Sequence, residues 1–492
     1  MSNSSKMSSI DLVSCTKYQY GLHYDSSNIA SRYENDDVNS PWCTHHPEQM
    51  EITGDNENLT VKSNNKYDYQ GYTYISQPLN KVCVAPEHTN NIKIRYTENL
   101  GHHINSYICC KVGTEQVAEF DEHGLDNIPQ WLIKDRDDRD DYKKIVGNQI
   151  YLTEWTDFLP YDEISTPFPF SHSENDKYAI PLFLLRGQKE NDNPEYNKVE
   201  FTIKRRTNIL DLIEMIKRTV DEDGNETWHV IKPNARYLVK LENDGKIPFP
   251  EIWADYHKVP IQVRQHVRDQ SIKNDDHPGI FKLYIRSMIT IQSRNPVPFG
   301  KTELIPLRST IPVLSIFFKA RNIEVAKFNG YSNYTNMLSP TDKSKSPISM
   351  DGIKYGNSYR IPLRKSNHSS RDGVYKRFPC TPEKVGYHAH NIDPNMRDCG
   401  NIGLIYNNLG EANLEVKLGD SLPMDKNIDK VINEEDDIIL GNSNANADDK
   451  QDKYHIFVNL LTFTTIDINV NTGAVNVHKG GGDDTVVKIE VD

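Results

Sequence analysis

Short runs in which apolar and polar residues alternate recur along most of this chain. A period of two predicts strands that bury one face and expose the other. The clearest runs are Ile92–Tyr96 and Val199–Lys204. Further strands are predicted over residues 104–112, 281–285, 289–292, 313–318, 414–418 and 456–470, with a last short strand at 486–491. Residues 179–185 are apolar throughout, which predicts a strand buried on both faces.

Helical patterns are short. Residues 208–218 and 261–269 are each predicted to form one short helix. Residues 131–144 contain a charged run, from Asp135 to Asp141, which predicts a solvated helix or loop rather than a site. The predicted fold class is therefore all-β, with short helices and long loops.

One segment rich in breaker residues divides the chain. Residues 242–250 include one glycine and two prolines, which interrupt both strands and helices. Strand-rich stretches lie on either side, at 91–241 and 280–477, so we predict two β units with a boundary between Leu241 and Trp253. The predicted parts are an N-terminal arm with little structure of its own (1–79), a first unit (80–245), a second unit (246–478) and a C-terminal tail (479–492).

Composition narrows the class of protein. The 492 residues carry 57 basic and 70 acidic side chains, a net charge of −13, which argues against a general nucleic-acid binder. No apolar run approaches the roughly 18 residues that predict a membrane-spanning helix. The first residues lack an apolar stretch, which predicts no secretory signal.

Cysteine usage predicts free thiols. The seven cysteines are odd in number and never spaced two residues apart as in metal-binding or redox motifs. Cys109 and Cys110 are adjacent in a predicted strand, so their side chains should point to opposite faces. A reducing compartment without a disulfide framework is expected.

Strand-and-turn motifs follow one another in order between about residues 85 and 478. In chain order they are Asn99-Leu100-Gly101-His102, Gly113 with Phe120-Asp121, Val146-Gly147-Asn148, Ile180-Pro181-Leu182-Phe183, Trp253-Ala254-Asp255-Tyr256 with Arg264 and Arg268, residues 312–318, Gly386-Tyr387-His388-Ala389-His390, Cys399-Gly400-Asn401-Ile402, and residues 456–470 with Gly473. The ordered set resembles the double jelly-roll major capsid proteins of nucleocytoplasmic large DNA viruses. The chain departs from the family at Gly113-Thr114, where Gly-Gly is usual, so it resembles a divergent member.

This resemblance implies two tandem eight-stranded antiparallel jelly rolls and a structural role in the shell of a large DNA virus. It implies a pseudo-hexagonal homotrimeric capsomer that tiles an icosahedral shell in the virion, after assembly in the host cytoplasm. The implied partners are the chain itself, neighbouring capsomers, minor capsid proteins and an inner viral membrane or its proteins, without sequence-specific nucleic acid. The polar insertions at 204–234 and 326–379 are the expected outward tower loops.

Three histidine pairs are candidate metal ligands, but none of them is part of a complete ligand set. They are His45-His46, His102-His103 and His388 with His390. The last pair would project from one face of a strand, as in a cupin, but the nearest acid, Asp393, lies in a turn. All three pairs are therefore predicted to be surface or loop histidines. We predict no catalytic, cofactor-binding or metal-binding residue, no cofactor and no enzymatic activity.

Two other functions remain open. A tandem jelly roll can be a carbohydrate-binding protein, and four tyrosines in the second insertion would suit sugar stacking: Tyr331, Tyr334, Tyr355 and Tyr359. The competing interpretation is that these rings pack beneath the loop or at a trimer contact. A penton or scaffold relative of the same viral lineage is the third possibility.

Overall fold

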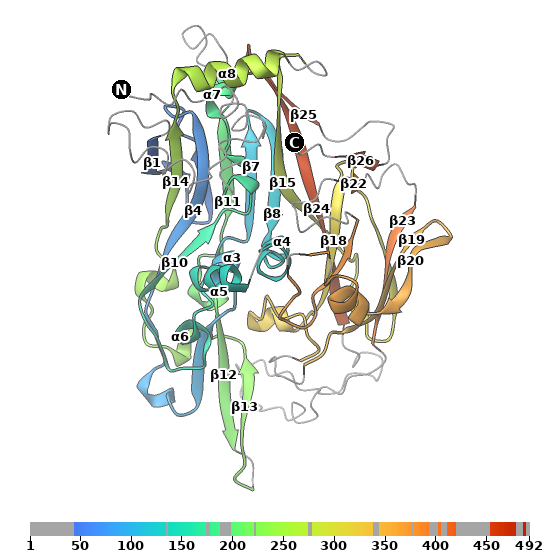
Figure 1. Ribbon diagram of the computed structural model, residues 1–492. Helices are drawn as coiled ribbons and strands as arrows, with labels where there is room; N and C mark the ends of the chain where they lie inside the picture. Colours follow the sequence, from blue (N-terminus) through green and yellow to red (C-terminus); the bar gives the residue numbers. More distant parts are fainter. Residues whose placement is uncertain are drawn as a thin grey trace, which may run out of the picture.

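The computed structural model shows two pairs of β-sheets standing side by side (Figure 1). It describes residues 44–133, 136–173, 178–186, 198–220, 223–273, 278–337, 344–375, 377–378, 380–392, 402–404, 411–419, 453–478 and 486–488. The strand ladders in both pairs are antiparallel, which confirms the predicted all-β class. No helix among these residues is long and apolar enough to cross a membrane.

The first sandwich packs a four-stranded sheet on a five-stranded one. Alternation of apolar and polar residues explains a central strand of this sandwich: Val199, Phe201 and Ile203 are buried in the core, whereas the residues between them are not. The first sheet has the order β1 (Thr44–Gln49), β14 (Glu251–Lys258), β4 (Tyr69–Leu79), β10 (Asp162–Pro167). The second has the order β2 (Ile52–Gly54), β3 (Asn58–Lys62), β11 (Val199–Lys204), β7 (Tyr107–Val112), β8 (Glu115–Asp121).

The second sandwich is built around the long strand β24 (Lys453–Asn469). This strand lies between β15 (Ile280–Gln292) and β18 (Val313–Asn322). The same sheet continues through β22 (Ile402–Leu404) and β26 (Val486–Lys488) and also includes β16 (Val297–Pro298), β21 (His388–Asn391) and β25 (Val475–His478). The facing sheet has the order β17 (Thr302–Pro306), β23 (Ala412–Leu418), β19 (Ile348–Tyr355), β20 (Ser358–Lys365). The predicted eight strands per roll stay a prediction.

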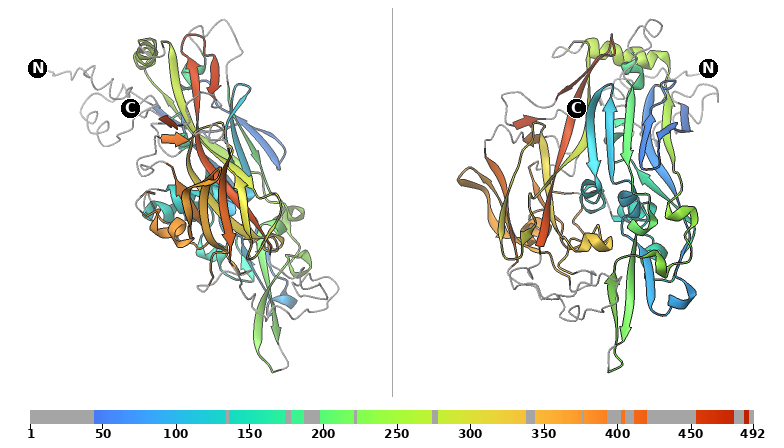
Figure 2. Two further views of the ribbon diagram at one scale, coloured as in Figure 1. Left: turned by 90° about the vertical axis from the view of Figure 1, so that its right-hand side faces the viewer. Right: turned by 180° about the vertical axis from the view of Figure 1, so that it is seen from behind.

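A smaller sheet projects from one end of the first sandwich (Figures 1 and 2). It has the order β13 (Glu226–Ile231), β12 (Ile213–Val220), β6 (Ile92–Tyr96), and beside it β5 (Val82–Cys83) pairs with β9 (Phe158–Leu159). Its base has an apolar cluster of its own, which includes Ile94, Tyr96 and Ile213. The β12–β13 hairpin extends from this base as the farthest point of the molecule at that end.

Short helices fill the ends and the space between the sandwiches. They are α3 (Leu100–Ile104), α4 (Glu122–Leu125), α5 (Arg136–Ile145), α6 (Ile150–Thr153), α7 (Leu182–Leu185) and α8 (Ile261–Ile272). The helix α8 confirms the prediction at 261–269 and crosses the end opposite the hairpin (Figure 1). Two arginines fasten it there: Arg264 Nη1 lies 3.3 Å from Asp68 Oδ1, and Arg268 donates to the Phe183 carbonyl at 3.1 Å.

One apolar core runs through both sandwiches without a break. Trp131, from a π-helical turn at Ile128–Leu132, stacks on Phe317 of β18 with ring centroids 5.8 Å apart and also contacts Phe378. A shared core of this kind makes the two halves one mechanical unit. The described cysteines are free thiols, as predicted for them: Cys83, Cys109, Cys110 and Cys380.

The structure corrects the predicted limits of the arm and of the two units. Residues 44–79 were expected to have little structure, yet they form β1 to β4, and β4 pairs with both β14 and β10. The pattern is hidden because polar residues such as Gln70 and Gln77 are buried in β4 and satisfied there. The strand β14, assigned to the second unit, also pairs with β1 and β4, so the junction lies after Lys258. Residues 1–43 and most of 479–492 lie outside the described residues.

Three local predictions are wrong. Residues 182–185 form the buried turn of α7 rather than a strand, and an apolar run of this length does not distinguish the two. The expected helix at 208–218 is a 3₁₀ turn at Ile209–Asp211 followed by β12. The insertion at 326–379 is not simply a loop, because it contains β19 and β20.

Candidate functional site

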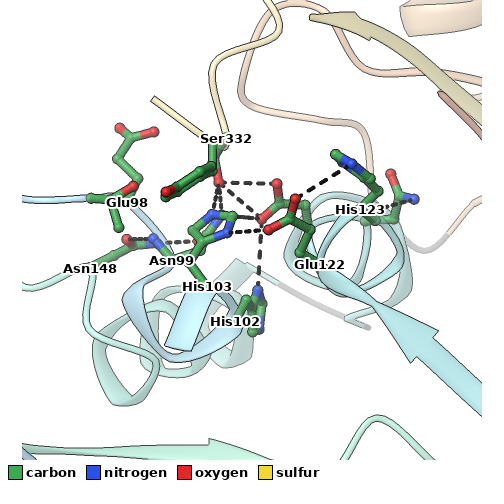
Figure 3. A network of polar contacts seen from close by, with 12 residues as sticks. Glu98, Asn99, His102, His103, Glu122, His123, Asn148 and Ser332 are labelled. Carbon is green, nitrogen blue, oxygen red and sulfur yellow. Dashed lines mark hydrogen bonds and ion pairs between the residues drawn. The ribbon is translucent and has the colours of Figure 1, made fainter. Parts of the chain in front are cut away.

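The most unusual chemical feature is a buried polar network between the two sandwiches, which we call the junction network. It gathers His102 and His103 from α3, Glu122 and His123 from α4, and Ser332 from the second sandwich (Figure 3). The helix α4 begins where the Asp121 side chain accepts from the Gly124 amide at 2.7 Å. The helix α3 follows Asn99, whose left-handed backbone (φ 52°) is one that asparagine tolerates.

Asp126 is the centre of the junction network. Its carboxylate accepts hydrogen bonds from Asn99 Nδ2 at 2.9 Å, from Ser332 Oγ at 3.0 Å and from Tyr334 Oη at 2.9 Å. His102 and His103 each place a ring nitrogen 3.8 Å from it. Burial alone would raise the pKa of Asp126, but the nearby imidazoles and a lysine outweigh burial, so this pKa lies well below its usual range.

Glu122 forms a second centre beside it. Arg206 Nη2 lies 2.6 Å from Glu122 Oε2, and ring nitrogens of His103 and His123 lie within 3.7 Å of the carboxylate. Burial opposes ionisation, yet the hydrogen bond from His103 and the charges around it lower the pKa of Glu122. Burial lowers the pKa of His123 far below its usual value, with a further contribution from Arg321. Both carboxylates are therefore paired charges in a low-dielectric site.

A lysine from the second sandwich completes the network. Lys319 on β18 is fully buried, and its Nζ donates to the His123 carbonyl at 2.8 Å. The ammonium lies 4.3 Å from the ring centroid of Tyr334 and 5.0 Å from that of Tyr387. Burial lowers the pKa of Lys319 to about 8, against the opposing effect of Asp126. A single lysine after a run of apolar strand residues was the sequence signal that could have revealed it.

Further contacts lock the two sandwiches together around this network. Asn329 Nδ2 donates to the Leu210 carbonyl at 2.6 Å and to the Ile213 carbonyl at 2.7 Å, both at the base of the projecting sheet. Lys384 pairs with Glu98 across the same boundary. The junction therefore combines an apolar core with charge pairs and hydrogen bonds, as a permanent interface does.

A second buried cluster surrounds His388 and His390 on β21. Ser346 Oγ lies 2.8 Å from His388 Nε2, and Ser369 Oγ lies 3.0 Å from its Nδ1 while donating to Asp351 at 2.7 Å. His390 Nε2 lies 2.8 Å from Asp351 Oδ1. Burial lowers the pKa of His388 to about 4, so this imidazole is neutral near pH 7. The cluster ties β21 to β19.

The structure corrects the prediction that all three histidine pairs are surface or loop residues, because the second pair lies on α3 and the third on β21. His102, His103, His388 and His390 are buried, and only His45-His46, on the edge strand β1, is at least partly exposed. Within the described ranges, no group of three or more His, Cys, Asp or Glu side chains is arranged to hold a metal ion. Asp393, the acid considered for the last pair, lies outside the described residues.

The four tyrosines do not form a common sugar-binding face. Tyr331 and Tyr334 are buried at the junction, where Tyr334 bonds to Asp126. Tyr359 lies on the outer sheet of the second sandwich, where its hydroxyl donates to Glu415 at 2.8 Å. The first two rings therefore pack beneath the loop, as the competing interpretation expected.

Large apolar side chains are exposed on the segments beside the projecting sheet, and we call this set the apolar patch. It comprises Ile150, Tyr151, Phe158, Tyr161 and Val239, of which Ile150 is 71% and Tyr161 61% exposed. The strands β5 and β9 hold it together, because Cys83 pairs with Phe158 and accepts a backbone hydrogen bond from Val239 at 2.9 Å. Tyr151 donates to Asp162 at 2.6 Å, next to Tyr161.

Comparisons with known proteins identify the fold. No family model and no curated protein sequence matches the chain. A quasi-atomic model of the PBCV-1 virus capsid superposes with a TM-score of 0.62 at 12% identity, covering 91% of this chain and 100% of that one. The chain has the double jelly-roll fold of viral major capsid proteins. PBCV-1 VP54, fitted into a reconstruction of the Sputnik virophage, gives 0.60 at 12% identity over the same shares.

A third double jelly roll agrees with this assignment. The Faustovirus major capsid protein has a TM-score of 0.56 at 8% identity, covering 88% of this chain and 93% of that one. Because these matches span nearly the whole of each chain, both sandwiches and their relative placement belong to the shared fold. The ordered motifs of the sequence therefore pointed to the correct architecture.

Proposed function

We propose that this chain is a structural capsid protein of a large DNA virus and acts without catalysis. The observation that carries the proposal is the match of both sandwiches together to the PBCV-1 capsid protein over 91% of the chain. A single jelly roll hosts many functions, whereas two rolls fused through a common core are an architecture suited to tiling. The proposed location is the virion, with assembly in the host cytoplasm.

The proposed functional unit is a homotrimer with a pseudo-hexagonal outline. Three chains with two rolls each present six similar units around a threefold axis, and a closed ring of this kind requires a heterologous contact. The apolar patch is our candidate for part of that contact, because a net charge of −13 opposes association that apolar burial does not offset. Neighbouring capsomers, minor capsid proteins and an inner membrane or its proteins are the further proposed partners.

The β12–β13 hairpin and the loops near it are proposed to form the outward tower. The hairpin belongs to the predicted insertion at 204–234 and extends beyond both sandwiches (Figure 1). Trp228 and Val220 on it are exposed. Surface loops and hairpins of this kind tolerate variation and carry contacts with other molecules.

A pair of matched variants tests the trimer. Ile150 and Ile261 are both exposed isoleucines at the first residue of a helix, α6 and α8, but only Ile150 lies in the apolar patch. We expect the chain to form a trimer by light scattering and Ile150→Glu to weaken self-association at least tenfold, about 1.4 kcal/mol. Ile261→Glu should remain trimeric.

Two results would contradict this arrangement. A wild-type chain that stays monomeric at high concentration would remove the trimer itself. If Ile150→Glu and Ile261→Glu self-associate equally well, the apolar patch is not part of the trimer contact, although the trimer itself could still form. A monomer that binds immobilised glycans would instead support the carbohydrate-binding alternative.

A further inference from the structure

A nucleophile and an amide face each other inside the junction. Lys319 Nζ lies 3.5 Å from Asn127 Oδ1, the first residue on the second sandwich and the other between α4 and the Trp131 turn of the first. Both side chains are almost wholly buried, at 0% and 1% exposure. The amide carbon that would react is bonded to Oδ1, and reactants held in contact in a fixed geometry gain a large advantage over free reactants.

Hydrogen bonds fix which end of the amide faces the lysine. Asn127 Nδ2 donates to Asn459 Oδ1 at 2.9 Å and to the His123 carbonyl at 3.1 Å. Asn459 in turn donates to Thr290 Oγ1 at 2.6 Å, and Thr290 donates to Asp121 at 2.8 Å. The amide nitrogen is therefore held away from Lys319, and the carbonyl end is turned toward it.

We propose that Lys319 and Asn127 join in an intramolecular isopeptide bond that covalently links the two jelly rolls. The lysine nitrogen adds to the Asn127 side-chain carbonyl carbon, and the bond between that carbon and Nδ2 breaks. Starting from the lysine ammonium and the neutral amide, the products are one secondary amide and one ammonium ion. Atoms and charge balance, and no oxidant or other reactant is needed.

The site supplies the conditions that this reaction requires. Amines attack only as the neutral form, and a lysine whose pKa lies near 8 is neutral about one tenth of the time at pH 7. The rings of Tyr334 and Tyr387 border the ammonium, and the burial of Lys319 and Asn127 shields the site from bulk water. Asp121, whose pKa burial raises, accepts the last hydrogen bond of the chain from Thr290 and so helps to hold Asn459 and the Asn127 amide in place.

Asp126 is the competing partner for Lys319, and the geometry argues against it. Its carboxylate is held ionised by His102, His103 and three hydrogen-bond donors. An ionised carboxylate is a poor electrophile, and its reaction would release water rather than ammonia. The mass of the product therefore distinguishes the two acceptors.

The mass of the denatured full-length chain tests the proposal. We expect the folded wild-type protein, once denatured, to weigh less than its sequence mass by one molecule of ammonia. Fragmentation should recover a branched peptide that joins the segment around Asn127 to the segment around Lys319. Lys319→Met and Asn127→Ala should each lack this branched peptide, and Lys319→Arg serves if the methionine variant does not fold.

A cleavage experiment provides an independent readout. The 3₁₀ turn at Glu242–Gly245 lies between Asn127 and Lys319 in sequence, and its first three residues are exposed. A protease site placed at these three residues would cut the chain into two halves. The wild-type halves should migrate together on a reducing denaturing gel, whereas the Lys319→Met halves should separate.

Clear outcomes would overturn the isopeptide bond. Separate, unmodified peptides containing Asn127 and Lys319 from folded wild-type protein would exclude it, as would halves that separate. A loss of ammonia that persists in Lys319→Met would show that another asparagine had reacted. None of these outcomes depends on whether the chain builds a viral shell.

Discussion

At the scale of single residues, the most unusual feature of the molecule is its set of buried polar and charged side chains. Asp126, Glu122 and Lys319 form paired charges, and their pKa values are set by the balance between burial and neighbouring charges. The sequence could not reveal these pairs, because the residues are separated by up to about two hundred positions and meet only through the fold. Histidine pairs such as His102-His103 were visible, but nothing local indicates whether such a pair is exposed.

His172 offers a test of the cost of unpaired burial. Its ring contacts both Phe170 and Phe201, and neither ring nitrogen has a hydrogen-bond partner among the described residues. Because a buried polar group without a partner is destabilising, His172→Phe should stabilise the protein by about 1 kcal/mol in urea unfolding at pH 7.

The same residue predicts a pH dependence. Burial lowers the pKa of His172 to about 3, whereas the unfolded chain titrates near 6.5. The unfolded state therefore binds more protons below about pH 6.5, so stability should fall as the pH decreases from there toward 3. His172→Phe should reduce this loss, while the partly exposed His46→Phe should not. If His172→Phe loses stability with falling pH as steeply as the wild type does, His172 is not the source of this pH dependence.

At the scale of elements, alternating strands were predicted well and irregular ones were not. The limits of β6 and β11 agree with the sequence prediction. The strand β15 was predicted as two pieces, 281–285 and 289–292. Arg286 and Ser287 interrupt the apolar pattern between them, yet Arg286 is buried and donates to the Pro169 carbonyl at 3.0 Å. Tertiary partners of this kind override the local pattern.

Gly386 and Gly224 both have a positive φ, but only Gly386 is packed closely against another part of the chain. Alanine at the two positions therefore distinguishes the cost of backbone strain from the cost of a steric clash. A Cβ at Gly386 (φ 96°) would lie 2.1 Å from the Tyr334 carbonyl oxygen, whereas a Cβ at Gly224 (φ 81°), in the β12–β13 hairpin, would meet nothing within 4 Å. Gly224→Ala should therefore cost only about 1 kcal/mol. Gly386→Ala should lower the free energy of unfolding by about 3 kcal/mol or more, because the backbone at Tyr334 must move to relieve the clash. Urea midpoints that fall equally in the two variants would contradict this contact.

At the scale of the whole molecule, the tandem arrangement was predictable and its boundary was not. The breaker-rich segment at 242–250 does separate two strand-rich stretches, but β14, which follows it, returns to the first sandwich. Strand pairing between Tyr69 and His257 is invisible in local sequence, so the boundary was placed too early. The order of the strand-and-turn motifs, rather than the position of the boundary, indicated the double jelly-roll architecture.

The shared core and the contacts across the junction fit the proposed role in a shell. Two sandwiches that share one apolar core and several charge pairs across their boundary cannot shift against each other without breaking these contacts. In the proposed shell, a rigid double unit would present fixed edges to its neighbours and so favour one lattice over many. The hairpin and loops at one end remain free to vary.

The most direct test of the proposed role is mass spectrometry of purified virus particles that contain this chain. Quantitative peptide intensities measure its copy number relative to the other particle proteins. A shell protein should dominate the particle, with peptides from both jelly rolls at equal abundance. A trace amount would assign the chain to a penton or scaffold role, and its absence from particles would contradict a structural role in the virion.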